Sequence, residues 1–222
     1  MQILLALLLA AAPGEMTSLR IGADFPLTAD PASETWAAVP PTIAHLDRYG
    51  KPVPGHRTEI RSRWSPTHLH MLFTCPYEQL HLKPDPDTRS ETPRLWEWDV
   101  AEVFIGADFD NIRRYREFQV SPQGEWIDLE IDRSATPPVT NWEWNSGFEV
   151  KSRIDDAAKV WYGEMRIPFA ALGVERPAPG QRFRINVYRI QGGGPDRKYI
   201  TWQPVHSPSY HTPERFGTLR LE

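Results

Sequence analysis

"YREFQVSPQGEWIDLEI", residues 115–131, decides the fold class of this 222-residue chain. Apolar and polar side chains alternate with a period of two on either side of "SPQG", which is the pattern of a β-strand with one buried face. Pro122 and Gly124 stand where they suit a type I turn. The stretch therefore predicts a β-hairpin with strands over residues 115–120 and 125–131.

The second strand of this hairpin divides its side chains between two faces, because successive side chains of a strand point in opposite directions. The apolar set, which we expect to point into the core, is Ile127, Leu129 and Ile131. The other set, which we expect on a polar or ligand-facing surface, is Trp126, Asp128 and Glu130.

The same alternation recurs along the chain. It predicts further strands at "TEIRSRW" (58–64), "HLHMLFTC" (68–75), "VAEVFI" (100–105), "GFEVKSRI" (147–154), "VWYGEMRI" (160–167), "RFRINVYRI" (182–190), "YITWQPV" (199–205) and "GTLRL" (217–221). Only "IPFAALG" offers a helical turn, which Gly173 would end. So many short strands predict an all-β fold, a two-sheet antiparallel β-sandwich of jelly-roll-like form.

Composition narrows the classes of partner. The 25 Lys and Arg residues are interspersed with 29 Asp and Glu residues, for a formal net charge of −4. No basic stripe is present, so we expect neither a nucleic acid nor an anionic membrane as partner. A neutral or polar ligand suits this charge better.

The first residues, "MQILLALLLAAAPGE", predict a signal peptide over residues 1–18. The apolar run from Ile3 to Ala12 is too short to span a bilayer and is followed by small residues. No Lys or Arg precedes the run, so a misplaced start or a peripheral tail stays open. We expect export, to the periplasm or outside the cell, and one folded domain over residues 19–222.

Cys75 is the only cysteine. A single cysteine excludes an intramolecular disulfide and any thiolate-cluster metal site. Because it lies in the apolar run "LHMLFTC", we expect a buried, unreactive thiol.

"RLWEWDVAEVFI", residues 94–105, brings indoles and carboxylates together around an apolar strand. This combination suits a sugar, since a pyranose has a C–H face that packs on an indole and hydroxyls that need donors and acceptors. A carboxylate can accept two hydroxyl hydrogen bonds, and such charge-assisted bonds are strong.

This block, the hairpin, "WYGEMRIPFAALG", "RFRINVYRI", "ITWQPV" and "HTPERFGTLRLE" together resemble carbohydrate-binding module family 9-like proteins, within the wider DOMON-like group of β-sandwiches. The resemblance covers the chain from about Ile21 to Leu221. It implies a jelly-roll-like sandwich that binds sugars, with two tryptophans around a terminal ring and calcium ions that can brace the fold. It also implies a role in polysaccharide breakdown.

Carried over residue by residue, the resemblance implies that Trp96 is a stacking wall and that Glu102 accepts hydrogen bonds from hydroxyls, with Asp99 in the same block. Two interpretations without a ligand stay open. Trp96 would then be a buried structural indole, and Glu102 would pair with an arginine such as Arg116 on an adjacent strand. Asp99 also suits the capping of a loop or the binding of backbone amides.

The second tryptophan that would stack on the sugar ring is less well defined. The resemblance favours Trp202 in "ITWQP", with a core position as its alternative, and leaves Trp142 and Trp144 as further candidates. Asn186 and Arg189, in "INVYRI", are the candidate hydroxyl partners.

Two other chemistries remain as alternatives. A glycoside hydrolase would need a carboxylate pair, from Asp99 with Glu102 or from Asp128, Glu130 and Asp132, although Asp99 and Glu102 face opposite sides of a flat strand. A DOMON-type cytochrome would hold haem between His and Met side chains. His68 and His70 share a strand face, but surface or packing roles explain them better.

Metal ligands are not assigned to any residue. Asp108, Asp110 and Asn111 in "GADFDN" offer oxygen ligands for a structural calcium ion, and a turn explains them equally well. No other cofactor is expected. The sequence therefore predicts an exported carbohydrate-binding β-sandwich, not an enzyme, with a mono- or oligosaccharide as its partner.

Overall fold

The computed structural model describes residues 14–222. Most of the predicted leader lies outside the described residues. Strand β1 (Glu15–Arg20) nevertheless begins within the predicted leader. Met16 and Ser18 on this strand are buried. The folded part of the chain thus includes residues before position 19.

The remaining strands follow the predicted alternation closely. They are β2 (Thr42–Ala44), β3 (Thr58–Trp64), β4 (His68–Pro76), β5 (Val100–Gly106), β6 (Arg114–Val120), β7 (Trp126–Asp132), β8 (Val139–Asn141), β9 (Glu149–Asp155), β10 (Val160–Pro168), β11 (Arg182–Gln191), β12 (Lys198–Thr201) and β13 (Gly217–Leu221). Short 3-10 turns complete the described elements: η1 (Leu95–Glu97), η2 (Phe169–Leu172), η3 (Gly194–Asp196) and η4 (Pro213–Arg215). The predicted helical turn is η2, and Gly173 ends it with a φ of 73°.

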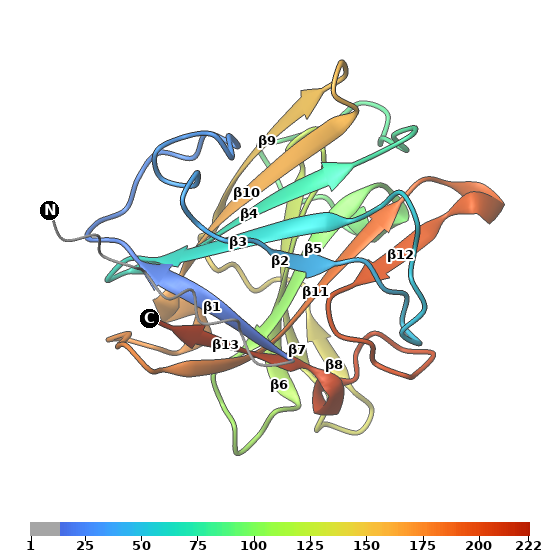
Figure 1. The fold of residues 1–222 in the computed structure, drawn as a ribbon. Helices are drawn as coiled ribbons and strands as arrows, with labels where there is room; N and C mark the ends of the chain where they lie inside the picture. The colour runs from blue at the N-terminus through green and yellow to red at the C-terminus, as the bar shows by residue number, and fades with distance from the viewer. Residues whose placement is uncertain (1–13) are drawn as a thin grey trace, which may run out of the picture.

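Two sheets pack against each other and are joined through β1. One sheet has the order β8-β7-β6-β5-β11-β13, with β12 also on β11, and the other has the order β3-β4-β10-β9, with β2 on β3. In Figure 1, β3, β4 and β10 cross in front of β5, β6 and β7. The all-β sandwich is therefore confirmed. Strand β1 differs from the antiparallel expectation, since it pairs in parallel with both β13 and β3.

The space between the sheets holds the main core. Trp161, Phe73 and Val103 are fully buried there, together with Cys75. The predicted burial of Cys75 is thus confirmed, and burial raises the pKa of its thiol to about 12, which disfavours the reactive thiolate.

A second apolar cluster covers the outer face of the sheet that contains β5. Ile127, Leu129 and Ile131 belong to this cluster, and Trp126 packs against the inter-sheet core instead. The three apolar residues are thus buried as predicted, but on the outer face of the sheet, and the expected surface position of Trp126 and Asp128 was wrong. The segment that follows β12 packs over the outer face through Val205 and other apolar side chains, so both faces of this sheet are apolar. Alternation alone does not tell which of two buried faces is the inner one.

The segment before β2 covers the outer face of the other sheet. The Trp36 indole is fully buried and donates to Glu164 on β10 at 3.0 Å. The backbone amides of Thr28 and Ala29 donate to the same carboxylate. Trp36 thus anchors the opening segment to the sheet.

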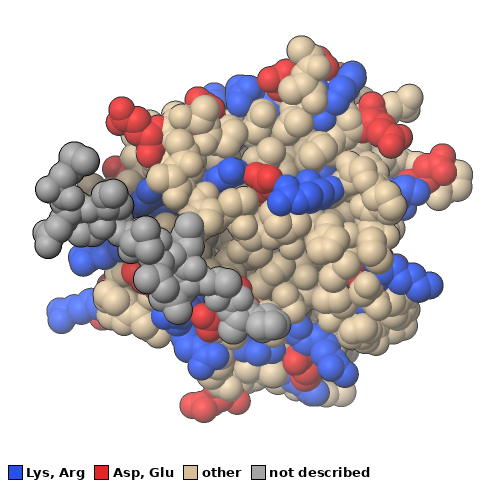
Figure 2. Space-filling model, viewed as in Figure 1, with Lys and Arg blue, Asp and Glu red and all other residues tan. Residues whose placement is uncertain are grey.

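Charges are mixed on the surface. Figure 2 shows Lys and Arg side chains interspersed with Asp and Glu on the face of the molecule in view. Within residues 14–222, no helix has the length and apolar character needed to cross a bilayer.

Candidate functional site

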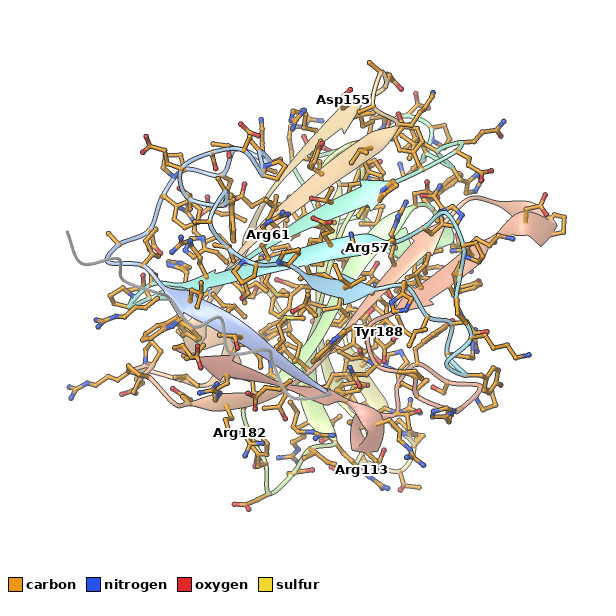
Figure 3. The ribbon with its side chains drawn as sticks, viewed as in Figure 1. Arg57, Arg61, Arg113, Asp155, Arg182 and Tyr188 are labelled. Carbon is orange, nitrogen blue, oxygen red and sulfur yellow. The ribbon has the colours of Figure 1, made fainter. Side chains whose placement is uncertain are left out.

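Glu102 lies at the middle of β5, on the outer face of its sheet. Its neighbours in register are Gln119 on β6 and Tyr188 on β11. Tyr188 is labelled in Figure 3, in the sheet behind β3 and β4. The side chain of Glu102 is buried, with only 6% of the residue exposed. Val100 and Phe104, which alternate with it on the strand, hold this face of β5 against the second apolar cluster.

The carboxylate of Glu102 receives no hydrogen bond from any residue in the described part of the chain. Two further acceptors beside it also lack a donor. On β6, Gln119 Nε2 donates to Glu117 Oε1 at 2.5 Å, which leaves Glu117 Oε2 and Gln119 Oε1 buried without a partner. A buried acceptor without a donor costs about 1–3 kcal/mol. These acceptors lie on one face of the sheet, and the described residues leave their hydrogen-bonding capacity unfilled.

Burial controls the charge of these groups. It raises the pKa of Glu102 well above its ordinary value, and the neighbouring Glu117 raises it further, while Arg197 opposes the shift. Burial also raises the pKa of Glu117 to about 7. Two neighbouring buried carboxyls do not both ionise readily, so each disfavours the charge of the other.

Trp96 stands on η1, directly before β5. The neighbouring Leu95 is fully buried and fixes the turn to the second cluster, whereas Trp96 is half-buried. Its carbonyl oxygen accepts a hydrogen bond from the Arg197 guanidinium. Its ring centroid lies 5.6 Å from that of Trp142, at an interplanar angle of 45°.

Two tyrosines lie on the other side of Glu102, at the β11–β12 side of the sheet. Tyr199 and Tyr210 stack with their centroids 5.7 Å apart. Arg48 covers the Tyr210 ring at 4.2 Å, and Arg197 covers the Tyr199 ring at 5.3 Å. The Arg197 guanidinium therefore links Trp96 to Tyr199, and aromatic rings and hydrogen-bond donors, the groups that suit a polyhydroxylated ring, come from both segments.

Asp99 is buried and bound by the protein itself. It accepts hydrogen bonds from the amides of His81 and Gly192 and from Gln191 Nε2. These bonds hold two loops to the start of β5. The structure thus gives Asp99 the amide-binding role that the sequence left open.

Asn186 and Arg189 are also occupied by protein partners. Asn186 donates to Tyr188 Oη and to the carbonyl of Gln203, and accepts from the Gln203 amide, so it ties β11 to the segment after β12. Arg189 points into the inter-sheet core and donates to the carbonyl of Pro76. Because side chains alternate along β11, these two residues cannot both face one ligand.

Trp202 faces the core between the sheets. Its side chain is buried in the main cluster, and its backbone amide donates to the carbonyl of Val187 at 3.0 Å. This placement agrees with the core position that was the alternative for Trp202. We therefore do not retain Trp202 as the second aromatic residue that stacks on the sugar. Trp144 also packs against the main core, beneath the guanidinium of Arg116.

Arg116 does not pair with Glu102. Its guanidinium bonds to Glu130 at 2.8 Å, and both residues lie on the opposite face of the sheet. The ion-pair interpretation of Glu102 was therefore wrong.

The structure gives little support to the two alternative functions, glycoside hydrolysis and haem binding. Asp99 and Glu102 point to opposite faces of the sheet, and Asp128 Oδ2 is held by the amide of Ser146. His68 Nδ1 and His70 Nε2 both bond to Asp24, at 2.7 Å and 3.0 Å. A hydrolytic carboxylate pair and a pair of haem ligands thus have no support here.

The segment "GADFDN", which could have supplied ligands to calcium, forms a turn between β5 and β6. Asp108 Oδ1 accepts the amides of Asp110 and Asn111, as in an Asx turn. In the described residues, no three His, Cys, Asp or Glu side chains are placed to hold a metal ion.

Sequence reasoning missed several residues of this site. They are Glu117, Gln119, Arg48, Arg197, Tyr199 and Tyr210. Glu117 and Gln119 alternate on β6, and only the register of β6 against β5 places them on the face of Glu102. The tyrosines and arginines come from segments whose meeting point depends on tertiary packing.

A comparison with family models decides the classification. The model described as "Carbohydrate family 9 binding domain-like" matches residues 34–222. The chain belongs to this family. The predicted family 9-like membership is thereby confirmed.

Solved structures share the fold of this family 9-like chain. A protein from Bacteroides uniformis has a TM-score of 0.72 at 15% identity, with 94% of this chain and 99% of that chain covered. A family 9 carbohydrate-binding module from Caldicellulosiruptor kristjanssonii in complex with glucose has a TM-score of 0.66 at 14% identity, over 94% of this chain and 95% of that chain. The same kind of module from that organism in complex with cellotriose also has a TM-score of 0.66, at 15% identity, over 94% and 93% of the chains.

One sequence relative extends the comparison. An extracellular protein from Arthroderma benhamiae is 23% identical over 181 residues, which cover 76% of this chain and 79% of the relative. The similarity therefore spans most of both chains.

Proposed function

We propose that this family 9-like protein binds a carbohydrate on the outer face of β5 and β6, with Trp96 as an aromatic wall and Glu102 as the principal hydroxyl acceptor. The observation that carries the proposal is the buried carboxylate of Glu102, which has no donor among the described residues and lies beside two further unsatisfied acceptors, Glu117 Oε2 and Gln119 Oε1. Sugar hydroxyls supply the missing donors.

Family membership supports the same ligand class. The Caldicellulosiruptor module with this fold has been solved with glucose and with cellotriose. Tyr199 and Tyr210 replace Trp202 as the second aromatic side of the proposed site. Neutral hydrogen bonds contribute about 0.5–1.5 kcal/mol each, so we expect dissociation constants in the micromolar to millimolar range.

Export and a role in polysaccharide breakdown belong to the same proposal. The Arthroderma relative is an extracellular protein, which supports export of this chain. Because Met16 and Ser18 are buried in β1, we place the end of any cleaved leader before Glu15. A sugar-binding protein outside the cytoplasm would hold polysaccharide or its fragments close to hydrolases.

A glycan array tests the proposal, followed by calorimetric titration of any glycan that binds. Trp96→Ala and Glu102→Gln should each reduce affinity at least tenfold, since each removes a principal contact of more than about 1.4 kcal/mol. Circular dichroism and urea unfolding establish that both variants are folded.

Phe109→Ala and Glu34→Gln are the matched controls. Phe109 is an exposed aromatic residue and Glu34 an exposed carboxylate, and neither lies on the face of Glu102. Both should bind like the parent protein. A folded Glu102→Gln variant with unchanged affinity would place the site elsewhere, and an array without any binding would remove the proposed function.

A further inference from the structure

The loop between β11 and β12, residues 192–197, contacts the short segment before β5 at two points. It contains η3 and extends to the right of the sandwich in Figure 1. At its start, the amide of Gly192 donates to Asp99 Oδ1 at 2.5 Å. At its end, the guanidinium of Arg197 donates to the carbonyl oxygen of Trp96. The loop therefore holds this segment from both of its ends.

The start of the loop is fixed by His81. The amide of His81 donates to Asp99 Oδ2 at 3.1 Å, and its ring stacks on Trp98 with the centroids 4.7 Å apart. Gly193 lies so close to this ring that a Cβ atom there would come within 2.8 Å of Nδ1. The φ of Gly193 is −121°, so the close approach, and not the backbone conformation, requires a glycine. Because the His81 ring is stacked on Trp98, it cannot turn away freely.

The end of the loop connects the two aromatic sides of the proposed site. The Arg197 guanidinium lies 5.3 Å from the centroid of the Tyr199 ring, while it donates to the backbone of Trp96. Trp96 stands on η1, which spans three residues and has no side-chain cap. A single 3-10 turn has poor hydrogen-bond geometry of its own. The bond from Arg197 is therefore an external restraint on the backbone that carries the Trp96 indole.

The charge of Arg197 also acts on Glu102. Burial and the neighbouring Glu117 raise the pKa of Glu102, and Arg197 opposes this rise. A displaced Arg197 would therefore release Trp96 and disfavour the ionised form of the acceptor at the same time. The aromatic residue and the acceptor of the proposed site thus depend on one guanidinium.

We propose that Arg197 is a positioning residue, which the β11–β12 loop holds against Trp96 so that the indole is oriented for a sugar ring before the ligand arrives. Asp99 and His81 act through this loop. The inference rests on the proposed function and concerns the preorganisation of the same site. A side chain that is already held in its bound orientation loses less conformational entropy on binding, so the restraint should appear as affinity.

The pair formed by Trp96 and Trp142 provides a test that needs no sugar. Their rings lie 5.6 Å apart at an interplanar angle of 45°. Two indoles in this arrangement couple as an exciton pair, which gives a couplet in the far-ultraviolet circular dichroism spectrum. Trp142→Phe should abolish the couplet and so assign it. Arg197→Ala should remove most of its amplitude, because the restraint on Trp96 is lost, and Arg197→Lys should restore part of it.

Sugar affinity is the second measurement. Calorimetric titration uses glucose and cellotriose, the ligands of the Caldicellulosiruptor modules. Arg197→Ala should weaken binding at least about fivefold, and Arg197→Lys should recover part of the loss. The matched control is Arg89→Ala, since Arg89 is an exposed arginine of the loop before η1 whose ion pair is with Asp87. It should leave the couplet and the affinity unchanged.

Gly193→Ala tests the loop without the removal of any side chain. Its added methyl group would press on His81 and displace the loop, so the couplet and the affinity should both fall. Gly22→Ala is the control, because a Cβ there would meet nothing within 4 Å. Cooperative urea unfolding establishes that each variant is folded.

The outcomes separate this inference from the proposed function. An unchanged couplet in folded Arg197→Ala overturns the role of Arg197, even if affinity falls, because Arg197 would then be a direct ligand contact. An unchanged couplet in Gly193→Ala overturns the role of the loop, and a parent spectrum without a couplet that depends on Trp142 overturns both. Loss of the couplet in Arg197→Ala, in a parent protein that binds no sugar, supports the restraint on Trp96 and removes the proposed function.

Discussion

The indole of Trp202 lies directly over Gly217 of β13, where a Cβ atom would come within 2.6 Å of two ring carbons and of the Gly14 carbonyl oxygen. Because Gly217 has no side chain, the Trp202 indole can pack directly against its backbone. The contact explains why Trp202, although it lies in a block that resembles a sugar-binding sequence, is a core residue.

Gly217→Ala should lower the free energy of unfolding by about 1–3 kcal/mol, because the added methyl group overpacks a rigid site that includes backbone atoms. The matched control is Gly22→Ala, where a Cβ would meet nothing within 4 Å. Urea denaturation checks both variants. Equal midpoints for the two would contradict the tight packing at position 217.

Substitutions of Asp99 and of Glu102 should have different effects, the first on the stability of the fold and the second on sugar affinity. Asp99→Ala leaves three donors without an acceptor, and should lower the free energy of unfolding by on the order of 3 kcal/mol. Glu102→Gln removes a buried carboxylate without a donor, so it should keep or raise stability at neutral pH while sugar affinity falls. Unfolding curves and titrations of both variants check this, and the opposite pattern would make Glu102 the structural residue.

Stability should depend on pH through Glu117. Burial raises the pKa of this carboxyl from 4.5 in the unfolded chain to about 7 in the folded protein. The folded state therefore binds the proton more tightly, and its contribution to stability is present below pH 4.5 and is lost as pH rises toward 7. Glu117→Gln should remove this loss, so its stability relative to the parent increases between pH 4.5 and pH 7. Urea midpoints across this range measure the difference, and a constant difference between the two proteins would contradict it.

The N-terminal boundary is open to a truncation experiment. A protein that starts at Gly14 should unfold cooperatively, whereas one that starts at Leu19 loses buried Met16 and most of the pairing between β1 and β13. Burial of one such side chain stabilises by about 1.5–3 kcal/mol, so the shorter protein should be less stable by at least that amount. Thermal unfolding of the two proteins tests this, and indistinguishable midpoints would show that residue 19 is a sufficient start.

Strand positions were predictable because apolar and polar side chains alternate with a period of two in almost every strand, as in the paired strands β6 and β7. The face that each side chain takes was less predictable. On β7, Ile127 and Trp126 both lie against apolar clusters, so the pattern contains two buried faces and no local signal that ranks them. The outer cluster exists only because the segment after β12 folds back over it.

The site was predictable only in part, for a related reason. Trp96 and Glu102 are six residues apart and share one loop–strand junction, so a short stretch brings them together. Asn186 and Arg189 were placed in the site because their residue types suit hydroxyls. Their hydrogen bonds to Gln203 and Pro76 depend on contacts between distant segments, which no spacing within "INVYRI" records.

The pairing of β1 with β13 joins the first and the last strand of the described residues, and Figure 1 shows these strands side by side. Two strands that are far apart in the sequence thus complete the sandwich. Such distant contacts delay folding, since a long loop must close before they form. Until residues 217–221 are available to pair with β1, the sheet lacks the strand that completes it, so the sandwich should close late in folding.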